Sequence, residues 1–517
     1  MNRRAFLAAI SALVAQSPYG CARASRRIDG QLLGPDLLSA HKIRQRNFPA
    51  PTQVRRTGIL IVGGGLSGLS AAWWLARQGY RDYAIVEGET EVGGNSRYGE
   101  STVTRFPWGA HYLPLLTREA RELRMLLEDL KVITGARPNG DPEYDPRFIV
   151  SPPQERLFQY GQWQPGLRPL VADRGKAEFA RFDDVVRELR EARGADGRPA
   201  FTTPSAHSSR DPRFTSLDRV SMAAWLQAHG FRDAALRWFI EYACRDDFGT
   251  MLDETSAWAG LHYFAGRKIR GDYADGAVLT WPEGNGFLVR RLREKLDTAI
   301  HTGHWIFRVD PSPHGVEARS WSGTHATLWQ ADQAVLAIPQ MVLPHLLATP
   351  ARVTLGYAPW LVANLHVSEL PGGAQPAWDN VIYDSPGLGY VVATHQALTQ
   401  RVSQSVLTYY LPFAGAPSQA RDLLLRSEWT YWRDIVLADI GRAHPDIGEV
   451  ATRLDVWRWG HGMVKPAPKL LFGDDLRAAR KSVGRMHFAH SDLSGMSLAE
   501  EAHYWGVEAA RSALQRA

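Results

Sequence analysis

The stretch that decides the predicted fold is Thr57–Gly94, which reads TGILIVGGGLSGLSAAWWLARQGYRDYAIVEGETEVGG. It opens with a short apolar run, Gly58–Val62, whose composition is that of a buried β-strand. A helix-like segment, Leu69–Gln78, follows, and a second apolar strand, Tyr83–Val86, comes after it. This order of strand, glycine turn, helix and strand is typical of the βαβ unit with which α/β domains bind a dinucleotide.

Three glycines in G-x-G-x-x-G spacing and one acid give this unit its predicted function. Gly63 permits the tight turn, Gly65 lets the backbone approach a pyrophosphate, and Gly68 lets helix and strand pack closely. The start of the helix offers unpaired N–H groups to the phosphates. Glu87 lies about 20 residues beyond the glycines, where a carboxylate accepts the ribose hydroxyls and repels a 2′-phosphate, so NADP is disfavoured. The predicted dinucleotide contacts are therefore Gly63, Gly65, Leu66, Ser67, Gly68 and Glu87.

A second glycine pair, Gly93–Gly94, favours FAD over NAD as the dinucleotide. It lies in the segment EVGGNSR, Glu91–Arg97. Read with the first glycines, this segment resembles the extended FAD fingerprint of the flavin-containing amine oxidase superfamily, which includes monoamine and polyamine oxidases, protoporphyrinogen oxidase and phytoene desaturases. The resemblance implies that Gly93, Gly94, Asn95 and Ser96 bring backbone close to the FAD diphosphate. An NAD-dependent dehydrogenase is the alternative, and extraction of the cofactor would test it.

Three further segments resemble parts of the same superfamily. Phe106–Tyr112 (FPWGAHY) is similar to the G-x-H-type segment that passes beside the flavin ring. His304–Val309 is similar to a strand whose backbone meets the adenine, and Ala331–Pro339 (ADQAVLAIP) to the strand that returns beneath the FAD. The resemblance implies cofactor contacts at Gly109, Ala110 and Ile306.

The C-terminal segment Arg485–Ala510 resembles the element that closes the FAD domain of the superfamily. There, a strand ends on an acid that holds the FAD ribitol or diphosphate, and the start of a helix then points at the flavin. The matching acid here is Asp492, and Met496 is implied to lie near the ring. The sequence departs from the pattern at His490–Ser491, where the superfamily usually has a single glycine, and this leaves the geometry of the loop open.

The predicted fold class is α/β, with a Rossmann-like FAD-binding domain of the GR2 type and an inserted, mixed α+β substrate domain. Residues 25–56 are predicted to be a linker or an arm laid over the surface. Within the second substrate segment, Gln419–Ile440 is predicted to be helical. The FAD-binding domain is expected to comprise residues 57–120, 275–345 and 454–517, and the substrate domain residues 121–274, mainly helical, and 346–453.

The first 24 residues, Met1–Ala24, resemble a twin-arginine export signal. Arg3–Arg4 precedes an apolar run, and Ala22–Ala24 offers an A-x-A cleavage site. The chain is therefore predicted to pass the twin-arginine translocase and to be periplasmic or secreted. Cys21 is an alternative site for a lipid anchor, although Pro18–Gly20 before it makes a poor lipobox. No later stretch is long and apolar enough to span a membrane.

The composition of the chain argues against several kinds of partner and site. Its 517 residues suffice for two or three domains, and its net charge is only +6 with scattered arginines, so no nucleic-acid partner is expected. The two cysteines are Cys21 and Cys244, so removal of the signal leaves no internal disulfide and no cysteine-based metal site. Cys244 is predicted to be a buried small hydrophobe, and no metal is expected.

Two departures from the superfamily bear on the reaction. Many of its amine oxidases carry a lysine in the strand that corresponds to Trp360–Val367, but this chain has no lysine between Lys295 and Lys465. Met496 stands where an aromatic residue often lies over the flavin. We therefore predict an FAD-dependent oxidoreductase, amine-oxidase-like in fold, that removes hydride from a C–N or C–C bond of a small organic substrate to flavin N5. The electron acceptor, O₂ or a quinone, stays open.

Two alternative functions fit the same fold. One is a dehydrogenase of the desaturase or protoporphyrinogen-oxidase kind, and the other is a non-catalytic flavin-fold binding protein. The candidates for flavin-side catalytic groups are His111, Trp459 and His461. His111 is equally well explained as a structural histidine. The charge cluster Arg245–Asp247 is predicted to be a structural ion-pair network.

Overall fold

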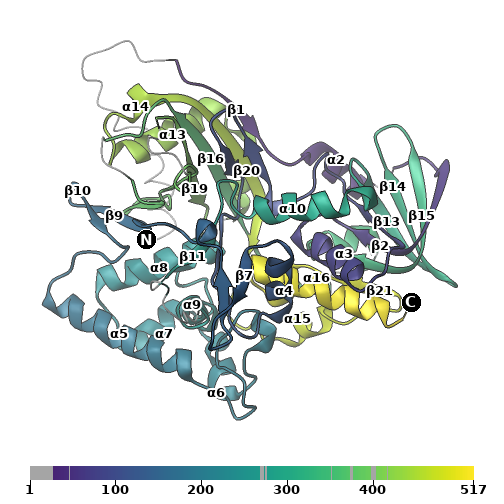
Figure 1. The fold of residues 1–517 in the computed structure, drawn as a ribbon, viewed down its shortest axis with the longest axis horizontal. Coiled ribbons are helices and arrows are strands. Elements are labelled where there is room, and N and C mark those ends of the chain that lie inside the picture. The colour runs from purple at the N-terminus through teal and green to yellow at the C-terminus, as the bar shows by residue number, and fades with distance from the viewer. Residues whose placement is uncertain are drawn as a thin grey trace.

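Two mixed β-sheets with helices packed against them make up the described part of this computed structural model (Figure 1). The structure describes residues 27–45, 47–267, 273, 276–347, 349–350, 352–372, 376–397, 403–415 and 417–516. The predicted export signal, residues 1–24 with Cys21, lies outside the described residues. Among the helices of the described residues, none is both long and apolar enough to cross a membrane.

The first sheet has seven strands and carries the predicted dinucleotide unit. Parallel pairs of β12, β3, β2, β15 and β21 form one part of it, and an antiparallel meander of β15, β14 and β13 forms the other. The strands are β2 (Gln53–Val62), β3 (Tyr83–Val86), β12 (Ile300–His301), β13 (Trp305–Ser312), β14 (Gly315–Trp321), β15 (Ala326–Leu336) and β21 (Met486–Phe488).

Alternate side chains of β2 enter two different cores because successive side chains of a strand point to opposite faces. Ile59 and Ile61 pack under the helices, whereas Leu60 and Val62 pack toward the meander. This explains why the second half of the strand, Gly58–Val62, is an unbroken apolar run, as strands covered on both faces are. The helices on the first face are α3 (Leu66–Arg77), α4 (Arg121–Asp129), α10 (Gly286–Leu296) and α16 (Ala499–Leu514).

Two glycines allow α3 to approach its neighbours more closely than a side chain would permit. A Cβ on Gly68 would lie 1.9 Å from the carbonyl oxygen of Gly63, so the predicted packing role of Gly68 is confirmed. A Cβ on Gly506 of α16 would lie 2.2 Å from the carbonyl oxygen of Ser67. The starts of α3 and α16 are thereby held side by side.

The second sheet has eight strands in the order β1, β20, β16, β19, β18, β17, β9 and β10. Leu361, Ala363 and Leu365 of β16 face a core with the helices α12–α14, whereas Trp360 and Val362 face the opposite side. The elements are β1 (Asp29–Leu33), β9 (Glu155–Gln159), β10 (Gln162–Pro165), β16 (Tyr357–Val367), β17 (Asp379–Ile382), β18 (Tyr390–Val392), β19 (Ser405–Pro412), β20 (Ala451–Val464), α12 (Pro417–Arg426), α13 (Trp429–Gly441) and α14 (Ile447–Val450).

A helical block with its own apolar core lies below the second sheet in Figure 1. It contains Cys244, which is buried and free as predicted. Its helices are α5 (Asp173–Glu191), α7 (Met222–Ala228), α8 (Ala234–Phe248) and α9 (Ala257–Ala265).

The remaining elements are short. The α-helices among them are α2 (Leu37–Lys42), α6 (Pro212–Thr215), α11 (Leu343–Leu347) and α15 (Asp474–Ala479), and the strands are β4 (Tyr98–Glu100), β5 (Arg105–Pro107), β6 (Tyr112–Pro114), β7 (Ile133–Ala136), β8 (Pro142–Tyr144) and β11 (Val278–Thr280). The 3₁₀ helices are η1 (Ile43–Gln45), η2 (Gly94–Ser96), η3 (Pro146–Phe148), η4 (Ser205–His207), η5 (Ser216–Arg219), η6 (Asp297–Ala299) and η7 (Ser491–Ser494).

The structure differs from the sequence expectations at several boundaries. The strand expected at Gly58–Val62 begins five residues earlier, at Gln53, because its first half pairs with β15. The helical segment expected at Gln419–Ile440 is two helices, α12 and α13. A domain boundary at residue 454 would divide β20, so we propose that the third FAD-binding segment begins after Val464.

The contact between α3 and α16 can be tested by substitution of Gly506. We expect Gly506→Val to lower the free energy of unfolding by about 2–3 kcal/mol, because its side chain would overlap the backbone of Ser67. Urea unfolding followed by circular dichroism measures this change. Gly448→Ala in α14, where a Cβ meets nothing within 4 Å, is the matched control and should unfold like the parent protein. Equal stability of the two variants would contradict the contact.

Candidate cofactor cleft and active site

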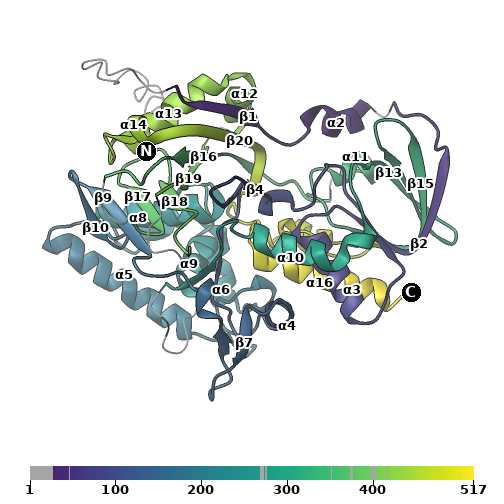
Figure 2. The same cartoon turned by 45° about the horizontal axis from the view of Figure 1, so that its top comes forward.

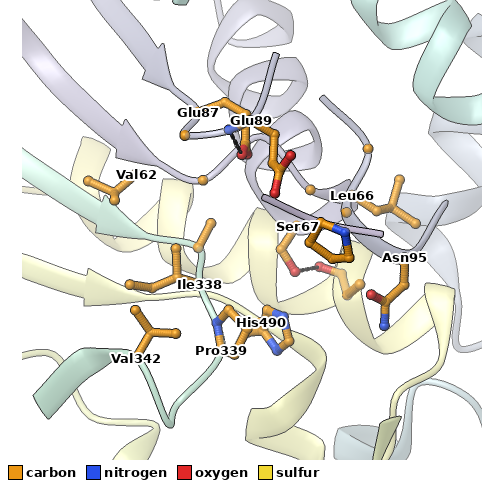
Figure 3. Close-up of a pocket in the computed structure, with 18 of the residues that line it drawn as sticks. Val62, Leu66, Ser67, Glu87, Glu89, Asn95, Ile338, Pro339, Val342 and His490 are labelled. Carbon is orange, nitrogen blue, oxygen red and sulfur yellow. Dashed lines mark hydrogen bonds between the residues drawn. The ribbon is translucent and has the colours of Figure 1, made fainter. Parts of the chain in front are cut away.

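A cleft opens where the carboxyl ends of β2, β3 and β15 meet the starts of α3 and α16 (Figure 3). Its cavity volume is about 350 Å³. In Figure 3, Val62, Ile338 and Val342 lie on one side of the open space and Leu66, Ser67 and Asn95 on the other. Ligands of open α/β sheets bind at this edge, outside the carboxyl ends of the strands.

The first glycine turn leaves room for a ligand against bare backbone. A Cβ built on Gly65 meets nothing within 4 Å, and one built on Gly94 meets only the Cα of Gly65, at 3.5 Å. Gly65 also forms an isolated parallel bridge with Gly93, so the first glycine turn and the Gly93–Gly94 pair lie side by side. Helix α3 starts at Leu66 with no side-chain cap, and its free N–H groups face the cleft. These features fit the diphosphate of a dinucleotide.

Glu87 ends β3 at one end of the cleft, beside Glu89 (Figure 3). Its Oε2 accepts a hydrogen bond from the backbone N–H of Gly64 at 2.7 Å, and its Oε1 accepts one from the N–H of Glu89 at 2.9 Å. Burial raises the pKa of Glu87 although both N–H donors act to lower it. The two donors orient the carboxylate, and each oxygen keeps a lone pair for a ribose hydroxyl.

A second, smaller cavity of about 120 Å³ adjoins the cleft. The two cavities share lining residues, so a ligand in the cleft can reach the second cavity. The shared residues are Asn95, Ala110, Trp459, Ser497, Leu498 and Ala499. Ala499 is the first residue of α16, which has no side-chain cap either, so its helix start also faces this junction.

Carboxyl groups dominate the polar wall of the second cavity. The hydroxyl of Tyr112 lies 3.2 Å from Asp246 Oδ2 and 3.2 Å from Asp247 Oδ1. Arg267 donates to both oxygens of Asp247, at 2.5 and 2.7 Å. Asp246 has no ion pair with any described residue, and Glu500 adds a third carboxyl group to the wall. Arg267 is the one permanent cation among the described residues that line this cavity, and it is already paired with Asp247.

Burial raises the pKa of the carboxyl groups Asp246 and Glu500. It raises the pKa of Asp246 to about 7, an effect that the adjacent Asp247 strengthens and Arg267 opposes. Burial also raises the pKa of Glu500 to about 7. Asn285 contributes a buried carbonyl oxygen that has no hydrogen-bond partner among the described residues. The indole N–H of Trp360 in the same wall is a buried donor without a partner among the described residues, so the wall offers carboxyl and carbonyl acceptors together with one free donor.

Comparison with known proteins agrees with this geometry. Residues 66–514 match the model of a family described as flavin containing amine oxidoreductase. The chain belongs to this family. Its cofactor is FAD, and the protein is an FAD-dependent oxidoreductase. No curated protein matches the sequence.

Several solved structures share the fold of this chain at low sequence identity. Putrescine oxidase with bound putrescine is 16% identical with a TM-score of 0.63, and the match covers 89% of this chain and 100% of that chain. Cyclohexylamine oxidase from Brevibacterium oxydans IH-35A is 16% identical with a TM-score of 0.65, covering 89% and 99% of the two chains. A fatty acid isomerase from P. acnes is 15% identical with a TM-score of 0.59, covering 87% and 97%.

Most of the predicted cofactor residues come together in the two cavities. Gly109 and the catalytic candidates His111 and Trp459 line the second cavity. His111 stacks near Tyr410, with ring centroids 4.6 Å apart, and burial lowers the pKa of His111 to about 3, so its ring is neutral. The predicted residues in the cleft are Gly63, Gly65, Leu66, Ser67, Glu87, Gly93, Gly94, Asn95, Ser96, Ala110 and Ile306.

Asp492 does not line either cavity, contrary to its predicted contact with the cofactor. Its carboxylate is buried, and Oδ2 accepts hydrogen bonds from Tyr357 Oη at 2.5 Å and from the N–H of Gln340 at 2.9 Å. Its Oδ1 lies 3.0 Å from Nδ1 of His490, which does line the cleft. Burial alone would raise the pKa of Asp492, but His490 and the two donors together lower it.

Three other predicted residues also lie outside the cavity walls. Met496 is fully buried in the core of the helical block, because Gly495 adopts a left-handed conformation (φ 73°) before it. Ser497 and Leu498 take its expected place at the junction. His461 packs edge-on to Tyr357, and Gly68 acts through helix packing.

Arg97 and Asp246 are site residues that sequence reasoning missed. Arg97 is 8% exposed and lines the cleft, and its Nε has no hydrogen-bond partner among the described residues. Its position at the end of EVGGNSR, close behind the second glycine pair, was an available signal for a cation near a diphosphate. Asp246 was expected in a structural ion-pair network of Arg245–Asp247, but of these three residues only Asp247 has an ion pair with a described residue, Arg267. Arg245 donates to backbone carbonyls, and Asp246 contacts the hydroxyl of Tyr112.

The open space in front of Gly65 can be tested with a larger side chain. We expect Gly65→Leu to fold normally and to bind FAD at least about tenfold more weakly, because its side chain would occupy the cleft. Titration of the apoprotein with FAD, followed by flavin fluorescence, measures the affinity. Gly448→Leu on α14, also in open space but away from the cleft, should bind FAD like the parent protein.

Proposed function

We propose that this protein dehydrogenates the C–N bond of a small, positively charged amine with FAD as the cofactor. The observation that carries the proposal is Asp246, a half-buried carboxyl group without an ion pair among the described residues, in a cavity that joins the cofactor cleft. A buried carboxylate is costly unless a cation compensates it. A substrate ammonium group would supply that cation.

The residues around Asp246 suit this task. Arg267 neutralises Asp247, so it leaves the charge of Asp246 for the substrate. The hydroxyl of Tyr112 lies within hydrogen-bond distance of both carboxyl groups and keeps them in place. The neutral ring of His111 and the indole of Trp459 provide flat, uncharged walls for the carbon skeleton.

When bound, FAD supplies the hydride acceptor for the carbon next to nitrogen. The chain itself must bind the amine, exclude water and take a proton. An ammonium nitrogen has no lone pair, so it must lose a proton before the carbon can release hydride. We assign the acceptor of that proton to the Asp246 carboxylate, where an N–H bond breaks and an O–H bond forms. Its raised pKa suits a group that both binds a cation and accepts a proton.

One observation favours the alternative of a desaturase or protoporphyrinogen-oxidase-like dehydrogenase. None of the described residues that line the second cavity is a lysine, and β16, which corresponds to the strand that carries a lysine in many amine oxidases of the superfamily, contributes Trp360 and Val362 to the lining. The fold alone does not decide, because the similar structures include a fatty acid isomerase. A non-catalytic binding protein would keep its flavin oxidised in the presence of every amine.

We also propose the finer features of the sequence prediction. The FAD-binding part is of the GR2 type, supported by the adjoining glycines Gly65 and Gly93 and by the meander β15, β14 and β13 that continues the seven-stranded sheet. The mature protein is periplasmic or secreted, supported by Arg3–Arg4 and the apolar run after it. Its electron acceptor is O₂ or a quinone, and the substrate is a small molecule.

The amine proposal can be tested with the flavin spectrum. We expect anaerobic addition of one member of a panel of diamines, polyamines and aromatic amines to bleach the flavin band near ~450 nm. We expect Asp246→Asn to lower kcat/KM for that amine by at least about 100-fold, because the buried cation loses its counter-charge. Asp253→Asn, at an exposed aspartate between α8 and α9, is the control. A panel that leaves the flavin oxidised would overturn the proposal.

The titration of Asp246 predicts a pH dependence. Its pKa of about 7 means that the carboxylate is progressively neutralised as the pH falls below 7. An aliphatic amine stays protonated throughout this range, since its pKa resembles the value of about 10 for lysine. KM for the amine should therefore rise by about tenfold for each pH unit below 7. Steady-state kinetics between pH 5 and 8 measure this, and the profile of Asp246→Asn should lack that rise.

A further inference from the structure

The N-terminal arm connects the two sheets across the mouth of the cofactor cleft. We define it as residues 27–45 and 47–52. It begins with β1 on the eight-stranded sheet, continues through α2 and η1, and leads into β2 of the seven-stranded sheet. Figure 2 shows α2 between the end of the sheet that holds β1 and β20 and the strands β13 and β15. The matched family region starts at residue 66, so the arm lies outside it.

The first end of the arm is anchored tightly. Strand β1 pairs in parallel with β20 over five residues, from Asp29 opposite Arg453 to Leu33 opposite Trp457. A Cβ on Gly30 would lie 1.9 Å from the carbonyl oxygen of Leu454 and 2.7 Å from the indole of Trp429. Only glycine fits this position, so the contact between the arm and β20 is close and specific.

The middle of the arm forms part of the cleft wall. Pro35, Ala40 and Ile43 line the same cavity as Glu87 and Ile306. Ile43 is 6% exposed and belongs to the apolar core that also contains Val62 and Leu346. Ala40 of α2 and Ile43 of η1 therefore face the cleft, whereas Leu38 of α2 is 87% exposed.

A hydrogen bond ties the arm to the residues that hold the ribose end of the cleft. The backbone N–H of Asp36 donates to Glu89 Oε1 at 3.0 Å, and Glu89 Oε2 lies 3.4 Å from Arg97 Nη1. The carboxylate of Asp36 caps α2 by accepting from the N–H of Ser39 at 3.0 Å. The start of α2 is thus held next to Glu87 and Arg97.

The second end of the arm rests on the meander. The ring of Phe48 stacks on Phe307 of β13 with centroids 4.1 Å apart. Lys42 Nζ lies 5.1 Å from the ring of Trp321 on β14. Both ends and the middle of the arm therefore make defined contacts, so of the two sequence expectations, a linker or an arm laid over the surface, these contacts favour the arm.

We propose that this arm is a strap that forms the outer wall of the FAD cleft at its adenosine end and controls how fast FAD leaves. The apolar residues Pro35, Ala40 and Ile43 supply contact area to the cofactor side of the cleft, and β1 and Phe48 hold them there. FAD that has bound can then dissociate only when the strap detaches. The proposal depends on FAD as the cofactor and not on the identity of the oxidised substrate.

The test is the rate of FAD release from purified holoprotein. Holoprotein is diluted into buffer that contains an excess of an apoflavoprotein as a trap, and the loss of bound flavin is followed by fluorescence. We expect Ile43→Ala, which shortens the wall, and Gly30→Val, which detaches β1, each to release FAD about tenfold faster than the parent protein. Leu38→Ala is the matched control on the exposed side of α2 and should release FAD at the parent rate.

The outcomes separate a strap from a merely structural arm. Ile43→Val, the conservative variant, should restore most of the slow release. Limited proteolysis should cut the arm faster in apoprotein than in holoprotein, since the bound cofactor and the strap support each other. If Ile43→Ala folds, binds FAD and releases it at the parent rate, the proposal is wrong. If Gly30→Val does not fold, the Ile43 variants and the proteolysis decide by themselves.

Discussion

The shape of the cofactor cleft depends on two places where a glycine lets two backbone segments touch without a side chain between them. Gly68 lies against the carbonyl of Gly63, and Gly506 lies against the carbonyl of Ser67. These contacts bring the uncapped starts of α3 and α16 to the same cleft. A Cβ on Gly68 would push α3 away from the turn after β2, and a Cβ on Gly506 would push α16 away from α3. Either change would move a helix start away from the cleft.

The two adjoining cavities have opposite electrostatic character. The cleft presents helix starts and Arg97, which suit the anionic part of a dinucleotide. The second cavity presents Asp246 and Glu500 beyond the already paired Asp247, which suits a cation. Both effects are strong because the groups are buried, where charges are poorly screened. Under the proposed function, the opposite charges of the two cavities separate the anionic cofactor from the cationic substrate.

The N-terminal arm links these two halves physically. Leu33 of the arm pairs with Trp457, whose ring lies 5.4 Å from that of Trp459 between the cavities. The same arm reaches the ribose end of the cleft through Asp36 and Glu89. Retention of the cofactor and the shape of the substrate cavity therefore rest on one continuous set of contacts.

The βαβ unit, its three glycines, the Gly93–Gly94 pair and Glu87 were determined by the sequence itself, because their function depends on spacing within a short stretch of chain. Strand β3 has the predicted bounds for this reason. Only the tertiary structure showed that Asp246 lies beside Tyr112, 134 positions earlier in the chain, and that β1 joins β20. It also turned Met496 and Asp492 away from the cavities, through the left-handed Gly495 and the hydrogen bond from Tyr357. These features depend on packing between segments that are far apart in the chain, so the spacing of neighbouring residues does not predict them.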